Sequence, residues 1–506
     1  MHDDLRIPYQ AGQAPSLDLG GIILDGKLQP DSPVNIVLKS LNRHGLIAGA
    51  TGSGKTKTIQ VLSEQLSLAG VPSLVMDIKG DISGLAFPGE ASDFLIKRNK
   101  SLNLDFTPRA FPVEMLTLND KEPSVPMRAT ITDFGALLFS RMLDLNDTQG
   151  GIVTITFEYA KDRKIPLIDL SDFKAILQYI QTDAGKKDIE SRFGSVSGSS
   201  IGIILRKVIE LEAQGGNSFF AEPAFNVMDL LRTNNEGKGI ISILRLIDMQ
   251  DNPKLFSTFM LKLLSDVYRQ FPELGDPPKP KLILFIDEAH LIFNNASKAL
   301  LNLLDTMVKL IRSKGVGLIF CTQTPNDIPD SVLSQLGLKI QHALRAFTAK
   351  DRQAMKLVAQ NFPPSEYYNT EQLLTALGIG EALVSALDEK GQPTPLIQCM
   401  VRAPESRMGV LSAQEMLSIV AQSTLYPRYS QRLNTPSAAE VLAAQKEPEQ
   451  EVQAKQSTGK TSDKEPSIFI SITKNTLFRQ LVRQAFRDMM NAIVKMLKGS
   501  GTNKRK

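Results

Sequence analysis

The chain has 506 residues, with 58 Lys and Arg against 54 Asp and Glu, which leaves a formal charge of +4. Hydrophobic residues make up 42% and charged residues 22% of it, an ordinary globular composition that excludes a fibrous or wholly disordered protein. The length predicts about two or three folding units. The small net charge excludes a surface that attracts nucleic acid as a whole, so any contact with nucleic acid must be local.

The two cysteines, Cys321 and Cys399, lie in separate apolar stretches and share no CxxC or Cys/His spacing. This pattern argues against a disulfide framework and against a zinc site, and it fits a reducing compartment. The first residues, MHDDLRIPYQ, carry acids where a signal peptide has bases, and no window reaches the ~18 apolar residues of a membrane span. We therefore expect a cytoplasmic protein without a transmembrane segment.

Short apolar, β-branched runs between Gly, Pro or Asp predict buried strands in alternation with amphipathic helices. Two short strands are expected first, at Gly21–Leu24 and Val34–Leu38. The later predicted strands are Gly45–Ala48, Ser73–Met76, Ile240–Leu244, Leu282–Ile286, Val316–Cys321, Ile340–Leu344, Glu381–Ser385 and Leu396–Val401. Helical patterns follow at Thr58–Ala69 and Ser297–Ser313. The alternation predicts an α/β fold with a doubly wound, mainly parallel sheet.

The alternation stops over 84–237, where amphipathic segments follow one another. These segments are Thr132–Leu143, Gly151–Lys161, Asp172–Gln181 and Ile201–Ala213. We interpret this region as a mostly helical insertion between the two parts of the core, 1–83 and 238–410. Two roles are open for it: covering a sheet edge, or gripping a substrate or a neighbouring subunit.

The C-terminal part of the chain changes character twice. A helical extension is expected over 411–442, followed by a disordered linker over 443–466 that is rich in Glu, Gln, Lys, Ser and Pro. Residues 467–506 then show apolar positions at helical intervals among Arg and Lys, which predicts a basic amphipathic helix. This helix could dock on its own core or on another subunit, or it could bind a membrane surface or a partner protein.

A phosphate-binding loop is the strongest motif in the sequence. The pattern GxxxxGK[ST], Walker A, is matched by Gly49, Ala50, Thr51, Gly52, Ser53, Gly54, Lys55 and Thr56. A strand precedes it and a helix follows it, so backbone N–H groups and the helix N-terminus converge on phosphate oxygens. Lys55 is expected to reach the β- and γ-phosphates of ATP, and Thr56 is expected to bind Mg²⁺. Thr58, one position beyond Lys57, is included among the nucleotide-binding residues.

A second motif, Walker B, ends the predicted strand in KLILFIDEAH with two adjacent acids. Burying acids at a strand end is costly without a cation, so Asp287 is expected to hold Mg²⁺, directly or through water. Glu288 is expected to orient and deprotonate the attacking water. Because a nucleotide switch does not need this second acid, the pair favours a hydrolase.

Other polar residues follow neighbouring strands. Asp77, at the end of SLVMD, is expected either to help position the metal or water or to be a plain loop acid. Gln323, after the strand in GVGLIFCT, is expected to sense the γ-phosphate. An arginine supplied in cis or from a neighbour commonly meets the charge on the transferred phosphoryl group. The candidates are Arg312, which we prefer, Arg345 and Arg43.

With these residues in hand, the chain resembles the HerA and FtsK group of P-loop ATPases, in particular its bacterial HerA-like members. The matching stretches are RHGLIAGATGSGKT, DIKGDISGLA, FFAEPAF, FIDEAHLIF, LIRSKGVGLIFCTQTPNDIPD, QLGLKIQHALRAFT and GEALVS. They run from Arg43 to about Gly409, which is nearly the whole chain before the linker. The resemblance implies a RecA-like core in a ring-shaped, often hexameric, ATP-driven motor that moves duplex DNA or protein.

By motif position, the resemblance implies that Lys55, Thr56, Asp287 and Glu288 carry ATP hydrolysis and that Gln323 is a sensor. It also implies that Arg312 is a finger acting in trans and that Arg43 contacts a phosphate nearby, and a nuclease partner is common among such relatives. One departure is that HerA carries a larger β-barrel domain before the loop, whereas some forty residues precede it here. The string DEAH also occurs in DEAH-box helicases, but the second lobe of those enzymes is missing.

Two functions are therefore carried forward. The first is an Mg²⁺-dependent ATPase that forms a ring and translocates DNA. The alternative is a protein-moving or nucleotide-controlled scaffold ATPase, similar to those of secretion and conjugation. ATP hydrolysis follows from the motifs, whereas DNA as the substrate follows from the resemblance alone.

Overall fold

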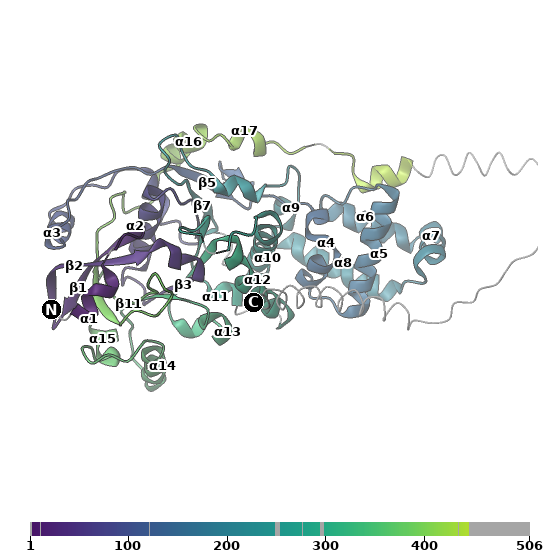
Figure 1. The fold of residues 1–506 in the computed structure, drawn as a ribbon. Coiled ribbons are helices and arrows are strands. Elements are labelled where there is room, and N and C mark those ends of the chain that lie inside the picture. Colours follow the sequence, from purple (N-terminus) through teal and green to yellow (C-terminus); the bar gives the residue numbers. More distant parts are fainter. Residues whose placement is uncertain are drawn as a thin grey trace, which may run out of the picture.

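A single large sheet organises the protein (Figure 1). The computed structural model describes residues 3–10, 12–120, 122–247, 253–275, 277–293, 298–433 and 435–444. Over these residues the sheet has 12 strands in the order β2-β1-β12-β11-β10-β3-β9-β8-β4-β7-β5-β6. From β10 to β6 neighbouring strands are parallel, whereas β11, β12, β1 and β2 pair antiparallel at the other edge. The expected mainly parallel α/β sheet is confirmed.

The strands agree closely with the expected runs. They are β1 (Ser16–Leu24), β2 (Lys27–Val37), β3 (Gly45–Ala48), β4 (Ser73–Asp77), β5 (Val113–Thr117), β6 (Val125–Pro126), β7 (Ile241–Arg245), β8 (Leu282–Ile286), β9 (Val316–Thr322), β10 (Leu338–His342), β11 (Glu381–Ser385) and β12 (Ile397–Val401). The N-terminal strands are longer than expected, and β10 begins two residues earlier. Two strands, β5 and β6, lie inside the region expected to be a helical insertion and extend the parallel sheet instead.

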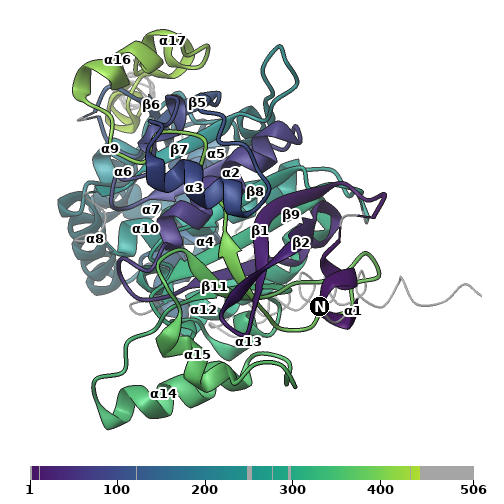
Figure 2. The ribbon, with the colours of Figure 1, turned by 90° about the vertical axis from the view of Figure 1, so that its left-hand side faces the viewer.

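The helices lie on both faces of the sheet and beyond its β6 edge. They are α1 (Asp3–Arg6), α2 (Lys55–Leu68), α3 (Asp93–Ser101), α4 (Ile131–Met142), α5 (Asp147–Arg163), α6 (Leu170–Gln181), α7 (Asp183–Phe193), α8 (Gly198–Ala213), α9 (Gly216–Phe219), α10 (Pro253–Gln270), α11 (His290–Phe293), α12 (Lys298–Ile311), α13 (Asp330–Leu333), α14 (Ala349–Gln360), α15 (Thr370–Ala376), α16 (Ala413–Ala421) and α17 (Tyr426–Tyr429). Figure 2 shows β1, β2 and α14 from the side opposite helices α4 to α8.

The central strands are apolar on both faces, and their alternating side chains enter two different cores. In β3, Leu46 and Ala48 join the core that contains α10 and α12, whereas Ile47 joins the core that contains α2. In β8, Leu284 and Phe285 divide in the same way. The sheet is thus covered on both faces, which leaves the carboxyl ends of its parallel strands as the place where polar groups gather.

The insertion is helical from α4 to α9 and forms a lobe to the side of the sheet (Figure 1). Several of its helices begin with paired side-chain caps, such as Thr130 with Asp133 before α4 and Asp169 with Asp172 before α6. Its apolar residues, including Phe139, belong to the same continuous core as the residues of α10 and β8. The helical lobe therefore packs on the sheet and α10 through one continuous hydrophobic core.

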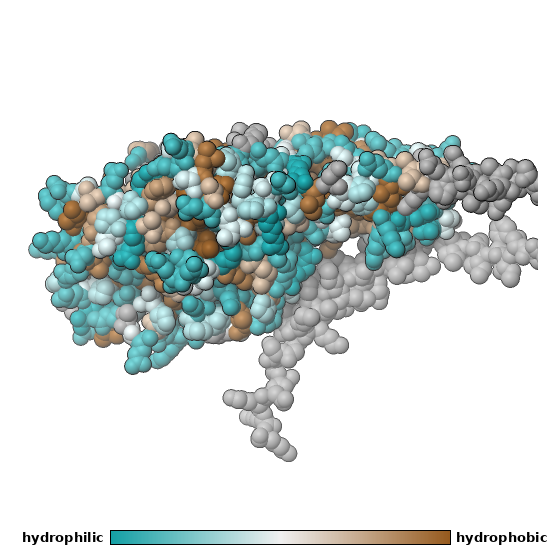
Figure 3. Space-filling view, turned by 90° about the horizontal axis from the view of Figure 1, so that it is seen from above, coloured by the Kyte–Doolittle hydropathy of each residue, from teal (hydrophilic) through white to brown (hydrophobic). Residues whose placement is uncertain are grey.

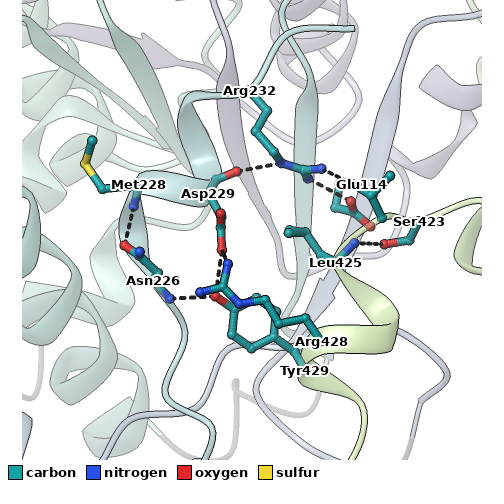
Figure 4. A network of polar contacts seen from close by, with 10 residues as sticks. Glu114, Asn226, Met228, Asp229, Arg232, Ser423, Leu425, Arg428 and Tyr429 are labelled. Carbon is teal, nitrogen blue, oxygen red and sulfur yellow. Dashed lines mark hydrogen bonds and ion pairs between the residues drawn. The ribbon is translucent and has the colours of Figure 1, made fainter.

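The extension after the last strand packs against β5 and β6 and is held there by polar contacts (Figure 4). The hydroxyl of Tyr429 donates to Asp229 Oδ2 at 2.6 Å, and Arg428 pairs with the same carboxylate at 3.1 Å. Arg232 Nε donates to the Asp229 carbonyl, and its Nη2 lies 2.7 Å from Glu114 Oε2. This cluster ties α17, the segment after α9 and β5 to one another. It also explains how an acid is tolerated within β5, because Glu114 is buried beside a guanidinium.

Among the described residues no helix is both long and apolar enough to cross a membrane. Over the face seen in Figure 3, hydrophobic residues occur in small groups among hydrophilic ones. The expected helical extension is present as α16, α17 and a helix over 438–444. The expected linker beyond 444 and the expected helix within 467–506 lie outside the described residues.

Candidate nucleotide site

The phosphate-binding loop connects β3 to α2, and backbone hydrogen bonds hold it against the carboxyl ends of β10 and β9. Ala50 N donates to the Ala343 carbonyl at 2.8 Å, and Gly49 N donates to the Thr322 carbonyl at 3.3 Å. A Cβ on Gly49 would lie 2.6 Å from the Cβ of His342, so only glycine fits there. The loop therefore rests on the neighbouring strands, in the strand-loop-helix context that the motif requires.

Lys55 and the start of α2 supply the positive groups of this loop. Lys55 Nζ donates to the carbonyl oxygens of Gly49 at 2.6 Å and of Ala50 at 3.2 Å, which places the ammonium over the loop. Burial lowers the pKa of Lys55, and the nearby Lys79 lowers it further. No side chain caps the N-terminus of α2 at Gly54. Its first N–H groups are thus free of side-chain caps and suited to an anion.

The two Walker B acids lie at the same edge of the sheet, because β9 lies between β3 and β8 and all three strands are parallel. Asp287 and Glu288 are both 5% exposed. Burial raises the pKa of Asp287 to about 7, although the ammonium of Lys79 opposes this change. Glu288 has φ of 46°, a strained left-handed conformation for a residue with a side chain. Such backbone strain is typical of functional sites.

A loop after β4 reaches both Walker motifs, and two of its residues were missed by the sequence analysis. Lys79 Nζ lies 2.5 Å from Glu288 Oε1. Thr56 Oγ1 donates to Asp81 Oδ2 at 3.2 Å. The available signal was the charged string DIKGD directly after an apolar strand, but that string does not reveal that β4 lies beside β8.

Asp77 forms the base of the turn that follows β4. Its carboxylate accepts hydrogen bonds from Gly80 N at 2.7 Å and from Ile82 N at 3.2 Å, and its side chain is fully buried. Burial raises the pKa of Asp77 to about 6. Both carboxylate oxygens accept hydrogen bonds inside their own turn, so Asp77 shapes the loop that carries Lys79, in agreement with the alternative of a loop acid. A contact of Asp77 with the metal or its water stays a prediction.

The structure corrects the expected nucleotide contact of Thr58. Its hydroxyl is fully buried and lies 2.9 Å from His342 Nε2, so it faces the sheet and not the phosphate loop. His342 Nδ1 lies 2.9 Å from the Glu381 carbonyl, and burial lowers the pKa of this imidazole to about 4. Thr58 and His342 form a neutral support beneath the loop, and the expected nucleotide contact of Thr58 is wrong.

Gln323 and Arg345 lie beside the loop in their own subunit. Together with Ala50, Thr51 and Asp351 they line a cavity of about 470 Å³. Gln323 follows β9, between the Walker A and Walker B strands, which is where a group that senses the γ-phosphate must lie. Arg345 follows β10, on the other side of β3. Of the three candidate arginines, Arg345 is the one that the structure places next to its own loop.

Arg312 and Arg43 lie at the amino ends of the parallel strands, opposite the phosphate-binding loop. Arg312 precedes β9, so the length of that strand, roughly 20 Å, separates it from Gln323. Arg43 precedes β3, and its guanidinium donates to the Gly391 carbonyl at 3.4 Å. Arg43 therefore lies away from the loop of its own subunit, and its expected contact with a phosphate stays a prediction. His44, just before β3, links β9 to α12. Its Nδ1 accepts from Leu318 N of β9 at 3.0 Å, and its Nε2 lies 2.8 Å from the Val308 carbonyl of α12.

The residues present fit a nucleotide and a magnesium ion. Asp287 is a buried carboxylate at the carboxyl ends of the strands, on the same side of the sheet as the Thr56 hydroxyl. The Oδ1 atom of Asp81 is also buried and has no hydrogen-bond partner among the described residues. Oxygen ligands of this kind are those that Mg²⁺ prefers. A cation there would stabilise the charged form of Asp287, which burial disfavours.

Comparisons with known proteins agree with this geometry. Residues 23–504 match the family described as "Helicase HerA-like C-terminal". The chain is 24% identical over 383 residues to the DNA double-strand break repair helicase HerA of Sulfurisphaera tokodaii, covering 72% of this chain and 66% of that protein. The HerA of Saccharolobus solfataricus is 24% identical over 380 residues, with the same shares. The chain thus spans about two thirds of the length of these relatives.

The fold is similar to that of the plasmid coupling protein TrwB, solved in complex with ADP and Mg²⁺. This similarity has a TM-score of 0.52 at 14% sequence identity and covers 80% of this chain and 94% of that one. The unbound bacterial conjugative coupling protein TrwB gives a TM-score of 0.51 at 14% identity, covering 81% and 93%. The chain therefore belongs to the HerA-like helicase C-terminal family and carries its P-loop ATPase core on a RecA-like fold.

Proposed function

We propose that the chain hydrolyses ATP with Mg²⁺, assembles head to tail into a ring, and uses this cycle to move duplex DNA. The observation that carries the proposal is the division of the site between the two ends of the parallel strands. Walker A, Walker B and Gln323 lie at the carboxyl ends, and Arg312 lies at the amino ends. A head-to-tail contact between two copies would bring these two ends together, and repetition of that contact closes a ring when the rotation between copies divides a full turn.

The geometry supports the following roles. The loop N–H groups and Lys55 would bind the phosphates, and Thr56 and Asp287 would hold Mg²⁺. The metal, when bound, neutralises charge on the phosphate oxygens. Glu288 orients a water and accepts its proton, while Gln323 contacts the γ-phosphate and Arg345 lies beside the loop. Arg312 of a neighbouring copy would stabilise the charge that develops on the transferred group.

DNA as the substrate is supported by family membership and by the name of the HerA relatives, DNA double-strand break repair helicase. The hexameric state stays an expectation from the resemblance. A nuclease partner stays an expectation of the same kind. A protein-moving or scaffold ATPase is the competing function, since the fold is shared with the coupling protein TrwB.

Duplex DNA is expected to raise the rate of ATP turnover several-fold, and rising salt is expected to weaken both DNA binding and this stimulation because phosphate contacts release counterions. The measurement is steady-state ATP hydrolysis with and without duplex or single-stranded DNA over a salt series, with Lys55→Ala as the background control. ATP turnover that ignores both forms of DNA, together with no salt-sensitive DNA binding, would contradict the DNA-moving function and favour the protein-moving or scaffold alternative.

A further inference from the structure

The loop at residues 77–81, which we call the β4 loop, touches both halves of the nucleotide site. It is held at its base by Asp77, which accepts from Gly80 N and Ile82 N, and it contacts Walker A through the hydrogen bond from Thr56 to Asp81. From this anchored turn, Lys79 extends to the Walker B glutamate. The turn therefore fixes where the ammonium of Lys79 lies relative to the loop and to β8.

Glu288 depends on this contact more than a surface acid would. The side chain of Glu288 is 7% exposed and that of Lys79 is 34% exposed, so the carboxylate has given up most of its water and faces one ammonium at 2.5 Å. His290 Nδ1 is the second neighbour, at 3.3 Å from Glu288 Oε2. Removing the partner of a buried charge leaves that charge uncompensated, which is a large perturbation.

The backbone conformation of Glu288 is a second sign that this residue belongs to a functional site. Glu288 has φ of 46°, a left-handed conformation that a residue with a side chain rarely adopts, and backbone strain of this kind gathers at functional sites. A general base must be held within hydrogen-bond reach of the proton that it takes. Lys79 is the cation that can fix the carboxylate oxygen from the neighbouring strand.

We propose that Lys79 is a positioning residue for ATP hydrolysis, which holds the carboxylate of Glu288 in its working orientation from the anchored β4 loop. This inference rests on the proposed ATPase function and adds a residue to it. Lys79 acts on the rate of the chemical step through Glu288, and it is not required for nucleotide binding.

The kinetic test compares Lys79→Met, Lys79→Arg and the exposed-lysine control Lys97→Met. Lys79→Met is expected to lower kcat by roughly tenfold to a hundredfold, within the range for a mispositioned base, while KM for ATP and the Kd of a fluorescent ATP analogue change less than about twofold. Lys79→Arg keeps a cation and is expected to restore much of kcat. A wild-type kcat in Lys79→Met overturns the proposal, and so does a loss of analogue binding, which would make Lys79 a phosphate ligand.

A second readout does not depend on turnover. The chain has no Trp, and Ile247 Cδ1 lies 3.0 Å from where a Cβ on Gly80 would be, so Ile247→Trp places a single indole beside the β4 loop. In that background, Lys79→Met and Glu288→Gln are each expected to change the emission of the indole, whereas Lys97→Met is not. Unchanged emission in both variants overturns the coupling of the β4 loop to Glu288. If the parent protein hydrolyses no ATP, the proposed function fails, and the emission still tests this contact.

Discussion

Glu288→Gln is expected to lower the rate of ATP turnover by roughly 10²- to 10⁴-fold while ATP still binds. Glutamine keeps the shape of the side chain but cannot accept a proton from water. The phosphate-binding groups, Lys55 and the start of α2, lie on a different strand-helix unit and are left intact. The measurements are steady-state hydrolysis and equilibrium binding of a fluorescent ATP analogue.

The matched control is Glu366→Gln, an equivalent substitution at an exposed position before α15. Turnover in this control should match that of the unsubstituted chain. Normal hydrolysis in Glu288→Gln would remove Glu288 from the role of general base. Lost binding of the analogue would instead show that Glu288 supports the fold of the site.

Lys55→Ala is expected to weaken nucleotide binding by roughly 10²-fold or more and to abolish turnover. Its ammonium lies over the loop carbonyls of Gly49 and Ala50, where phosphate oxygens would be met, and each charge-assisted hydrogen bond contributes ~1.5–3 kcal/mol. Titration of a fluorescent nucleotide into Lys55→Ala, with Lys97→Ala as the control, measures the loss. An unchanged Kd would mean that the nucleotide does not lie on this loop.

The sequence predicts the central strands well because they are buried on both faces. The runs at β3, β8 and β11 were predicted to the residue, since an apolar stretch between Gly, Pro or acids has few other solutions. β5 was missed because Glu114 interrupts its apolar pattern, and the charge is balanced by Arg232, more than a hundred residues away. Local periodicity cannot show such a pairing.

The residues of the candidate site also divide into those that a local pattern reveals and those that depend on contacts distant in the sequence. The Walker residues were found because their backbone chemistry is local to one loop and one strand end. Lys79 and Asp81 were missed because their importance depends on which strands are neighbours in the sheet. Asp77 and Thr58 were assigned by position along the chain, and the structure turns both side chains into the protein.

The most direct test of the account is whether two copies of the chain complete one site. Arg312→Ala and Lys55→Ala are each expected to be inactive alone. In a mixture, a Lys55→Ala subunit can offer its Arg312 to a neighbour whose own loop is intact, because Arg312 lies at the sheet edge opposite the loop. The measurement is ATP turnover over a series of mixing ratios. We predict that activity appears in the mixtures; no recovery at any ratio would contradict a site shared between subunits.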